Sequence, residues 1–350
     1  MPILTPSFLF DFESNMQAIV EDEYSRLSMN LWWSKYMKTR PTGSRQEIVA
    51  WLLTTAQIED LEKFGGKVPF EDLVSTYTTF EPKFAGAGLK LRRAQIEDLD
   101  GNGLSAAAKW SADIGAYMAY WPQKQAAALL KNGHLAASKS YDNVPFFSAA
   151  HPLNPYNVGA GTYQNIFTGA ASGAYPGACP IDDSVSLDVA LVNLAKMVAY
   201  VKSIKMPNGV DPRMLRPTGL IVPPRMQQRA VQLTNAKFIA QAATGGAGSA
   251  DVEALIQSFG FVEPTIADEL AGFESDTSFF LACESISKST LGGLVYVDRE
   301  AFKINYYTGQ GGGTGVDAIL DRAEELEYHC KGRNVAGYGH PYAMFKGKAT

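Results

Sequence analysis

The sequence predicts an α+β protein made of two folded modules and two extensions. Long apolar stripes with helical spacing occupy residues 103–132 and 186–204, and short apolar runs typical of buried strands follow them. Residues 48–91 instead have the pattern of a long hairpin without a second layer of its own. With 350 residues and 46% hydrophobic side chains, the chain can bury a sizeable core, which excludes disorder as its main state.

The net charge argues against a protein that wraps DNA. The chain carries 31 Lys and Arg against 36 Asp and Glu, a formal net charge of −5. Proteins that bind DNA without sequence preference usually have a basic surplus that neutralises phosphates. A charge of this size is ordinary for solubility and indicates no particular small-molecule substrate.

The cysteines and the N-terminus indicate a reducing compartment. Cys179, Cys283 and Cys330 lie far apart without a C-x-x-C pair, which excludes a zinc ribbon and a thioredoxin-like site. The first twenty residues have no Lys or Arg ahead of their apolar residues and do not fit a secretory signal. No stretch reaches the ~18 uninterrupted apolar residues of a spanning helix, so we expect a cytosolic origin and no membrane partner.

Residues 1–45 are expected to form an arm, because their apolar residues are scattered without a sustained stripe. Only residues 17–36 are expected to contain a short helix. A break at residues 41–44, Pro-Thr-Gly-Ser, precedes the hairpin of residues 48–91, which bends at Gly65 and Gly66. Such a two-stranded projection is marginal in water and is expected to lie on a neighbour.

Residues 103–132 form the longest predicted helix, with Trp110 and Ile114 on its apolar stripe. Pro122 removes one donor from the helical ladder and is expected to bend the helix, and Gly133 ends it. The following residues, 138–183, are rich in Gly, Pro, Asn and Ser and are expected to be mostly loop.

The second module is expected at residues 185–290. Helices are predicted at residues 186–204, 225–234 and 251–259, and strands at residues 219–222, 261–263 and 278–283. Further strands are expected at residues 294–298 and 302–307. For residues 323–330 the Glu-rich composition favours a helix and the position between two loops favours a strand, so both alternatives stay open.

One motif resembles a calcium-binding loop. Asp98, Asp100 and Asn102 have the spacing of the first half of an EF-hand, with a glycine at the sixth position. The twelfth position, which must supply a bidentate carboxylate, is Lys109. The motif is therefore interpreted as a turn that leads into the long helix.

Catalytic motifs are also missing from the sequence. The glycine-rich residues 309–315 lack the Gly-Lys-Ser/Thr of a phosphate loop. No Gly-x-Ser-x-Gly or His-Glu-x-x-His pattern organises His134, His151, His329 and His340. We therefore expect no catalytic residue, no metal site and no cofactor, and interpret the histidines as structural.

Several aromatic residues lie outside the predicted core helices. Those on the arm and the hairpin are candidates for burial against another chain, because aromatic side chains are enriched in interface cores. Burial against the chain's own body remains the alternative for each. The candidate contact residues, with the hairpin bend, are Trp32, Trp33, Phe64, Gly65, Gly66, Lys67, Tyr77 and Phe80.

The order of these segments resembles the major head subunits of Mu-like tailed bacteriophages, which have the HK97-like capsid protein fold. The segments that carry the resemblance are Arg93 before Ile96-Glu97-Asp98 and a Gly-Asn-Gly turn, Tyr141-Asp142-Asn143 before Pro145-Phe146-Phe147 and His151-Pro152, Pro217-Thr218 before Ile221-Val222-Pro223-Pro224, and Gly337-Tyr338-Gly339. Asn143 stands where the family has glycine.

The resemblance implies four parts and a structural function. Residues 1–45 would be the N-arm, residues 46–93 the E-loop, residues 94–184 and 291–350 the peripheral (P) domain with its spine helix, and residues 185–290 the axial (A) domain. Copies would form hexamers and pentamers of an icosahedral shell, assembled in the bacterial cytoplasm, that encloses double-stranded DNA without sequence-specific binding. Portal, scaffold or decoration proteins would be its partners.

Two other functions remain alternatives at this point. An encapsulin-type compartment would share the fold and hold a protein cargo. A soluble α+β hydrolase would form a small oligomer and lose turnover when a histidine or cysteine is replaced.

Overall fold

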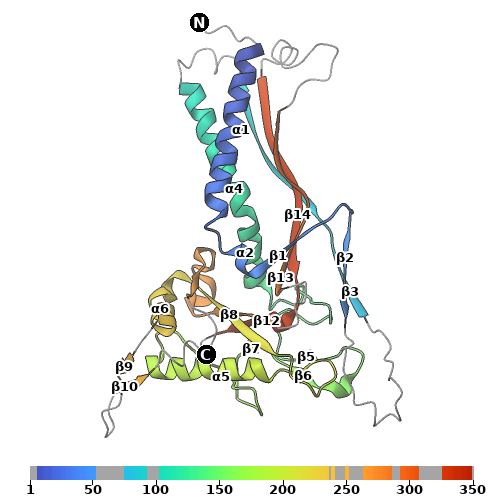
Figure 1. Cartoon of the computed structure of the whole chain (residues 1–350), viewed down its shortest axis with the longest axis vertical. Helices are drawn as coiled ribbons and strands as arrows, with labels where there is room; N and C mark the ends of the chain where they lie inside the picture. Colours follow the sequence, from blue (N-terminus) through green and yellow to red (C-terminus); the bar gives the residue numbers. More distant parts are fainter. Residues whose placement is uncertain are drawn as a thin grey trace, which may run out of the picture.

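The computed structural model describes residues 6–52, 75–92, 102–235, 238–240, 249–251, 263–285, 292–306 and 325–348. The molecule is elongated (Figure 1): two long helices and a sheet of long strands extend away from a second unit, in which a sheet packs against helix α5. We call these parts the upper unit and the lower unit. Among the described helices, none is both long and apolar enough to span a membrane.

The upper unit contains a four-stranded sheet, here the long sheet, in the order β1-β13-β14-β4. Its strands are β1 (Met37–Pro41), β13 (Leu294–Tyr306), β14 (Glu325–Tyr338) and β4 (Lys83–Arg92). β1 pairs with β13 in parallel, and the other pairs are antiparallel. Helices α1 (Pro6–Ser28) and α4 (Asn102–Asn132) cover one face of this sheet, and α2 (Trp33–Tyr36) connects α1 to β1.

Gly115 allows α1 and α4 to pack closely. A Cβ atom at Gly115 would lie 2.6 Å from the carbonyl oxygen of Val20, so only glycine fits this contact. Around it, Val20 joins Ile114, Met118 and Cys330 in one buried cluster that links both helices to β14. The helical layer and the long sheet therefore form one slab.

Polar side chains on either side of Pro122 hold α4 in place. The Trp121 indole and the Gln125 amide both donate to the Asn334 side-chain oxygen of β14, at 2.9 and 3.1 Å. Gln123 donates to Glu269 at 2.6 Å and accepts the backbone N–H of Trp32 at 3.0 Å. The helix continues through Pro122 and connects the arm, the long sheet and the lower unit.

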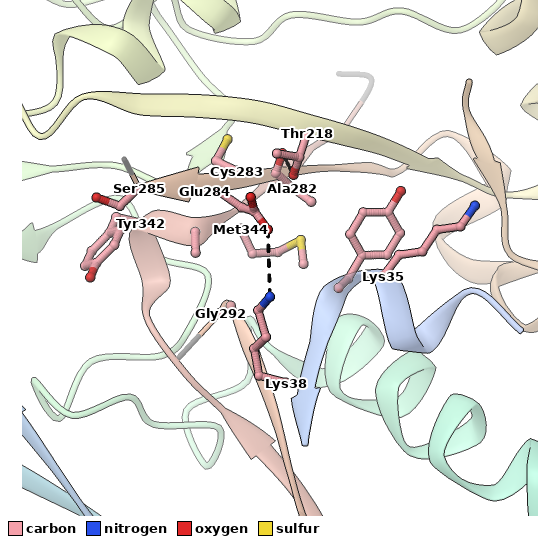
Figure 2. Close-up of a pocket in the computed structure, with 13 residues that line it drawn as sticks. Lys35, Lys38, Thr218, Ala282, Cys283, Glu284, Ser285, Gly292, Tyr342 and Met344 are labelled. Atoms are coloured by element: carbon pink, nitrogen blue, oxygen red, sulfur yellow. Dashed lines mark hydrogen bonds and ion pairs between the residues drawn. The ribbon is translucent and has the colours of Figure 1, made fainter. Parts of the chain in front are cut away.

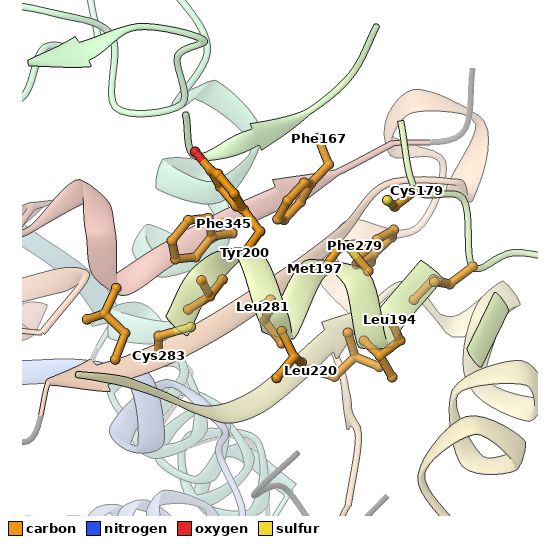
Figure 3. Close-up of a cluster of buried hydrophobic side chains, with 14 of the residues drawn as sticks. Phe167, Cys179, Leu194, Met197, Tyr200, Leu220, Phe279, Leu281, Cys283 and Phe345 are labelled. Carbon is orange, nitrogen blue, oxygen red and sulfur yellow. The ribbon is translucent and has the colours of Figure 1, made fainter. Parts of the chain in front are cut away.

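The lower unit is built on a five-stranded sheet, here the short sheet, in the order β11-β8-β12-β15-β7. The strands are β11 (Thr265–Ile266), β8 (Leu215–Val222), β12 (Phe279–Ser285), β15 (Met344–Gly347) and β7 (Ile166–Phe167). On one face, Leu194, Met197 and Tyr200 of α5 (Leu187–Ser203) pack on Phe279 and Leu281 (Figure 3). The other face of the short sheet packs on the C-terminal half of α4 through Ile221, Phe280 and Ala282.

Short elements complete the chain. They are α6 (Gln227–Asn235), which packs beside α5, the pair β5 (His151–Pro152) and β6 (Thr162–Tyr163), the pair β9 (Phe238–Ala240) and β10 (Ser249–Asp251), and the ribbon of β2 (Glu47–Leu52) and β3 (Ser75–Phe80). We use "ribbon" below for β2 and β3. Between residues 138 and 183 the chain is mostly loop, as predicted.

The predictions for the longest helices and for the strands at residues 219–222 and 278–283 are confirmed, whereas those for the arm and the C-terminal strands need correction. Of the strand predicted at residues 261–263, only Glu263 is among the described residues, and it lies outside any strand. The arm contains a 23-residue helix, α1, that ends at Ser28, not a short helix within residues 17–36. Residues 294–306 form one continuous strand instead of two. The ambiguous segment at residues 323–330 is a strand from residue 325 onward. The predicted helix at residues 251–259 lies outside the described residues, apart from Asp251, which is in β10.

Candidate assembly surfaces

The two faces of the ribbon differ in burial. Pairing of Glu47 with Phe80 and of Leu52 with Ser75 fixes the register. On the inner face, Val49, Trp51 and Phe80 are buried against Val295 and Val297 of the long sheet. Alternation along the strands places Ile48 and Tyr77 on the outer face, where they are 61% and 70% exposed. The ribbon thus presents an apolar outer face with no cover from the described part of the chain.

The two tryptophans of the arm pack against the chain's own body. Trp32 is only 6% exposed, and its indole donates to Glu269 at 3.2 Å. Trp33 lies against the ring of Tyr296, with 5.8 Å between ring centroids. The sequence left open whether these tryptophans are buried against another chain or against their own chain, and the structure has them packed against their own chain.

The remaining candidates lie on the hairpin. Phe80 is buried on Gly337, where a side chain would collide with its ring. Tyr77 is exposed and available to a neighbour. Phe64, Gly65, Gly66 and Lys67 lie outside the described residues. Sequence reasoning missed Ile48, although the alternation in Glu-Ile-Val-Ala-Trp-Leu, with apolar residues on both faces, could have indicated it.

An aromatic stack fixes the base of the ribbon to the body. The Trp51 ring lies 4.2 Å from that of His340, which stacks on Tyr342 at 4.5 Å. The Arg213 guanidinium lies 3.8 Å from the centre of the Tyr342 ring. Burial, together with the charge of Arg213, holds the pKa of His340 well below its usual range. His340 is therefore a neutral packing residue at neutral pH.

His151 forms a fully buried pair with Asp142. Its Nδ1 lies 2.6 Å from the Asp142 carboxylate and its Nε2 lies 3.1 Å from the Phe146 carbonyl, and neither side chain is exposed. A substrate has no access to this pair, so it stabilises the loop instead of catalysing a reaction. Asn143, which follows Asp142 in the chain, has a φ of 62°, a left-handed conformation that asparagine tolerates and glycine prefers.

A pocket of 430 Å³ lies where the arm meets the lower unit (Figure 2). Lys35 and Lys38 line it on one side, and Thr218, Cys283 and Glu284 line it on the other. Lys38 and Glu284 form an ion pair of 3.9 Å whose side chains are about half exposed, so its contribution to stability is small. The pocket carries no paired acid and base or nucleophile with an activating partner.

The three cysteine thiols are shielded from solvent by burial. Cys179, Cys283 and Cys330 are free and buried, and burial raises the pKa of each, that of Cys330 to about 11. Reactive cysteines have a lowered pKa and are accessible, so these three are packing residues. In the part of the chain that the structure describes, no three His, Cys, Asp or Glu residues come together as a metal site.

Comparisons with known proteins agree with the resemblance seen in the sequence. Residues 13–176, slightly less than half of the chain, match the family model of the Mu-like prophage major head subunit gpT. A comparison with curated protein sequences gave no match.

Solved capsid structures have a similar fold. The procapsid of bacteriophage JBD30 is similar with a TM-score of 0.50 and 14% identity, over 99% of this chain and 77% of that one. The capsid of cyanophage P-SCSP1u is similar with a TM-score of 0.51 and 11% identity, over 90% and 86%.

The slab with its long helix, the projecting ribbon and the lower α+β unit have the HK97-like fold of these phage capsid structures. The residues 13–176 that match the Mu-like major head subunit model include most of α1, the ribbon, β4 and α4.

Proposed function

We propose that copies of this chain assemble into the icosahedral head of a tailed phage and enclose its double-stranded DNA. The ribbon carries the proposal. Its inner face is buried, whereas Ile48 and Tyr77 on its outer face are 61% and 70% exposed. Exposed apolar residues grouped on a projecting element are typical of a surface that another chain covers.

We assign the parts of the chain to roles in the shell. Residues 1–45 are the N-arm and residues 46–93 the E-loop, which includes the ribbon and β4. Residues 94–184 and 291–350 form the P domain around α4. Residues 185–290 form the A domain, whose sheet also takes in β7 and β15. Axial domains would meet in hexamers and pentamers, and the E-loop would lie on the adjacent subunit.

The proposed contacts follow from this assignment. Tyr77, with Phe64, Gly65, Gly66 and Lys67 of the hairpin, would contact the neighbouring subunit. Portal, scaffold or decoration proteins would be further partners, and assembly would take place in the host cytoplasm. Closed symmetry would then combine many modest contacts into a stable shell.

Expression of the chain followed by size exclusion and negative-stain microscopy tests the proposal. We expect particles far larger than a small oligomer, because the fold leaves apolar and charged faces open. A stable monomer or dimer under all conditions, including in the presence of its scaffold protein, would contradict shell assembly.

Deletion of residues 62–70, the hairpin bend, tests the role of the E-loop. We expect a folded subunit that fails to form shells, because the deletion lies between β2 and β3 and leaves both strands intact. Val210→Ser, at a residue that is 74% exposed in the lower unit, is the matched control and should assemble normally. Normal particles from the deletion variant would refute the assignment of the E-loop.

A further inference from the structure

Beyond the ribbon, no described element covers the outer face of the long sheet, and this face carries a pair of exposed lysines. Lys303 of β13 and Lys331 of β14 are exposed and lie directly opposite each other in the register. Cys330, next in the chain, is buried toward α4. Because successive side chains of a strand alternate between its faces, both lysines project away from the helices.

Among the described residues, no acidic side chain forms an ion pair with either lysine. Like charges directly opposite each other in a sheet are destabilising. Within the described residues neither Lys303 nor Lys331 forms an ion pair, whereas Lys90 and Glu327 on the same face pair at 3.0 Å. A sheet that keeps this unfavourable pair favours an acidic partner at that position.

A depression in the surface lies beside the lysine pair. Gly86 of the edge strand β4 pairs with Lys331, and Gly88 pairs with His329. Together with Phe84, which is 72% exposed, these residues line a depression of about 600 Å³. A Cβ atom at Gly86 would collide with the Cys330 carbonyl of the chain's own β14, so close strand pairing requires this glycine. The depression itself gives an acidic segment of a partner room beside Lys331.

An acidic turn lies at the same level on the opposite face of the slab. Val20 of α1 and Cys330 of β14 belong to one buried cluster. Glu21 and Asp22 follow Val20 and are exposed, just as Lys331 follows Cys330 on the other side. If a second copy lies beside the first at the same height, the acidic turn of one copy meets the lysine pair of the other.

We propose that Lys303 and Lys331 of one copy bind the α1 turn with Glu21 and Asp22 of an adjacent copy. This inference rests on the proposed shell function and names a contact within it. Because the two surfaces differ, the contact is head-to-tail, the kind that closes into a ring when the rotation between copies allows it. Electrostatic complementarity would fix the relative position of neighbouring slabs.

Charge reversal and its compensation test the contact. In the full chain, Lys303→Glu with Lys331→Glu, or Glu21→Lys with Asp22→Lys, should lower the yield of particles at least tenfold, because like charges then meet. All four substitutions together should restore most of the yield. Thermal unfolding of each subunit checks that the fold is retained.

Zero-length carbodiimide cross-linking of wild-type particles is a second measurement that needs no variant. We expect a link between Lys303 or Lys331 and Glu21 or Asp22, formed between isotope-labelled and unlabelled copies and absent from dissociated subunits. Its absence from intact particles would overturn the proposal.

Three results of the charge variants would also overturn it. Normal particles from the Lys303→Glu, Lys331→Glu variant would overturn this contact but leave the proposed shell assembly intact. A variant with all four substitutions that folds but forms no particles would also overturn the contact. If the lysine double variant forms normal particles that no longer retain a short DNA duplex, the two lysines bind DNA phosphates and not a neighbouring copy. If the wild-type chain forms no particles, the proposed function fails first, and this inference fails with it.

Discussion

The short sheet and the long sheet differ in how much of their surface the chain itself covers. The short sheet lies between α5 and the C-terminal half of α4, so Phe279, Phe280 and Leu281 are buried although they point to opposite faces. The long sheet is covered by helices on one face, and among the described residues the ribbon covers part of the other face, around Val295, Val297 and Gly337. Burial on both faces stabilises the fold, and the open face leaves surface for other copies.

Phe280→Ala should have the largest effect on stability, because it opens a cavity where the short sheet meets α4. Loss of a fully buried phenylalanine lowers the free energy of unfolding by about 3–5 kcal/mol. Chemical denaturation of dissociated subunits, followed by circular dichroism, measures the change. Phe84→Ala, at an exposed position of the long sheet, is the control, and an equal loss in both variants would contradict the comparison.

Glu274→Gln should have the next largest effect, because it removes the counter-charge of a buried lysine. Lys346 of the short sheet is 1% exposed, and its Nζ lies 2.7 Å from the Glu274 carboxylate. Burial lowers the pKa of Lys346, and Glu274 offsets this only in part. We expect a loss of about 3 kcal/mol, partly recovered when Lys346→Met is added. No recovery in the double variant would argue against the ion pair as the cause.

The same pair predicts a dependence on pH. Burial alone would raise the pKa of Glu274, but hydrogen bonds from Lys346 and Ser278 and the nearby lysine charges outweigh it and lower the pKa. The ionised form of Glu274 therefore stabilises the folded subunit fully at pH values above the ordinary carboxyl pKa near 4.5. This stabilisation is lost as the pH falls through the lower pKa that Glu274 has in the folded state. Urea midpoints between pH 6 and pH 3 should fall less steeply in Glu274→Gln than in the wild type.

Tyr77→Ser should have the smallest effect on the subunit and a clear effect on assembly. Its side chain is 70% exposed on the outer face of the ribbon, so the free energy of unfolding should change by no more than about 0.5 kcal/mol. The yield of particles should fall, because the variant removes an aromatic residue from the proposed interface. Unchanged assembly would remove Tyr77 from the contact.

The elements that were predictable from the sequence are those whose pattern is strong along one segment. α4 and α5 have long apolar stripes, and β8 and β12 contain short apolar runs at residues 219–222 and 279–283. The helix α1 was underestimated because its stripe is weak and its stability comes from docking on α4 at Gly115. The prediction divides β13 at residues 299–301, where Arg299 and Glu300 are charged, and only the tertiary surroundings decide whether a strand continues through such residues.

The candidate surfaces were predictable only in part. The aromatic residues indicated the ribbon and the arm as candidate surfaces. They could not show that the Trp32 indole donates a hydrogen bond to Glu269 while Tyr77 is exposed. Elements distant in the sequence decide which face of each segment is covered. The Lys303–Lys331 pair depends on the register of two strands separated by residues 307–324, and no local pattern contains it.

Hydroxyl-radical labelling of Tyr77, compared between dissociated subunits and assembled particles, tests the central claim most directly. The claim is that a neighbouring copy covers the outer face of the ribbon in the shell. We expect labelling of Tyr77 to fall severalfold on assembly, while labelling of the buried Phe280 stays low in both states. Equal labelling of Tyr77 in subunits and particles would contradict the claim.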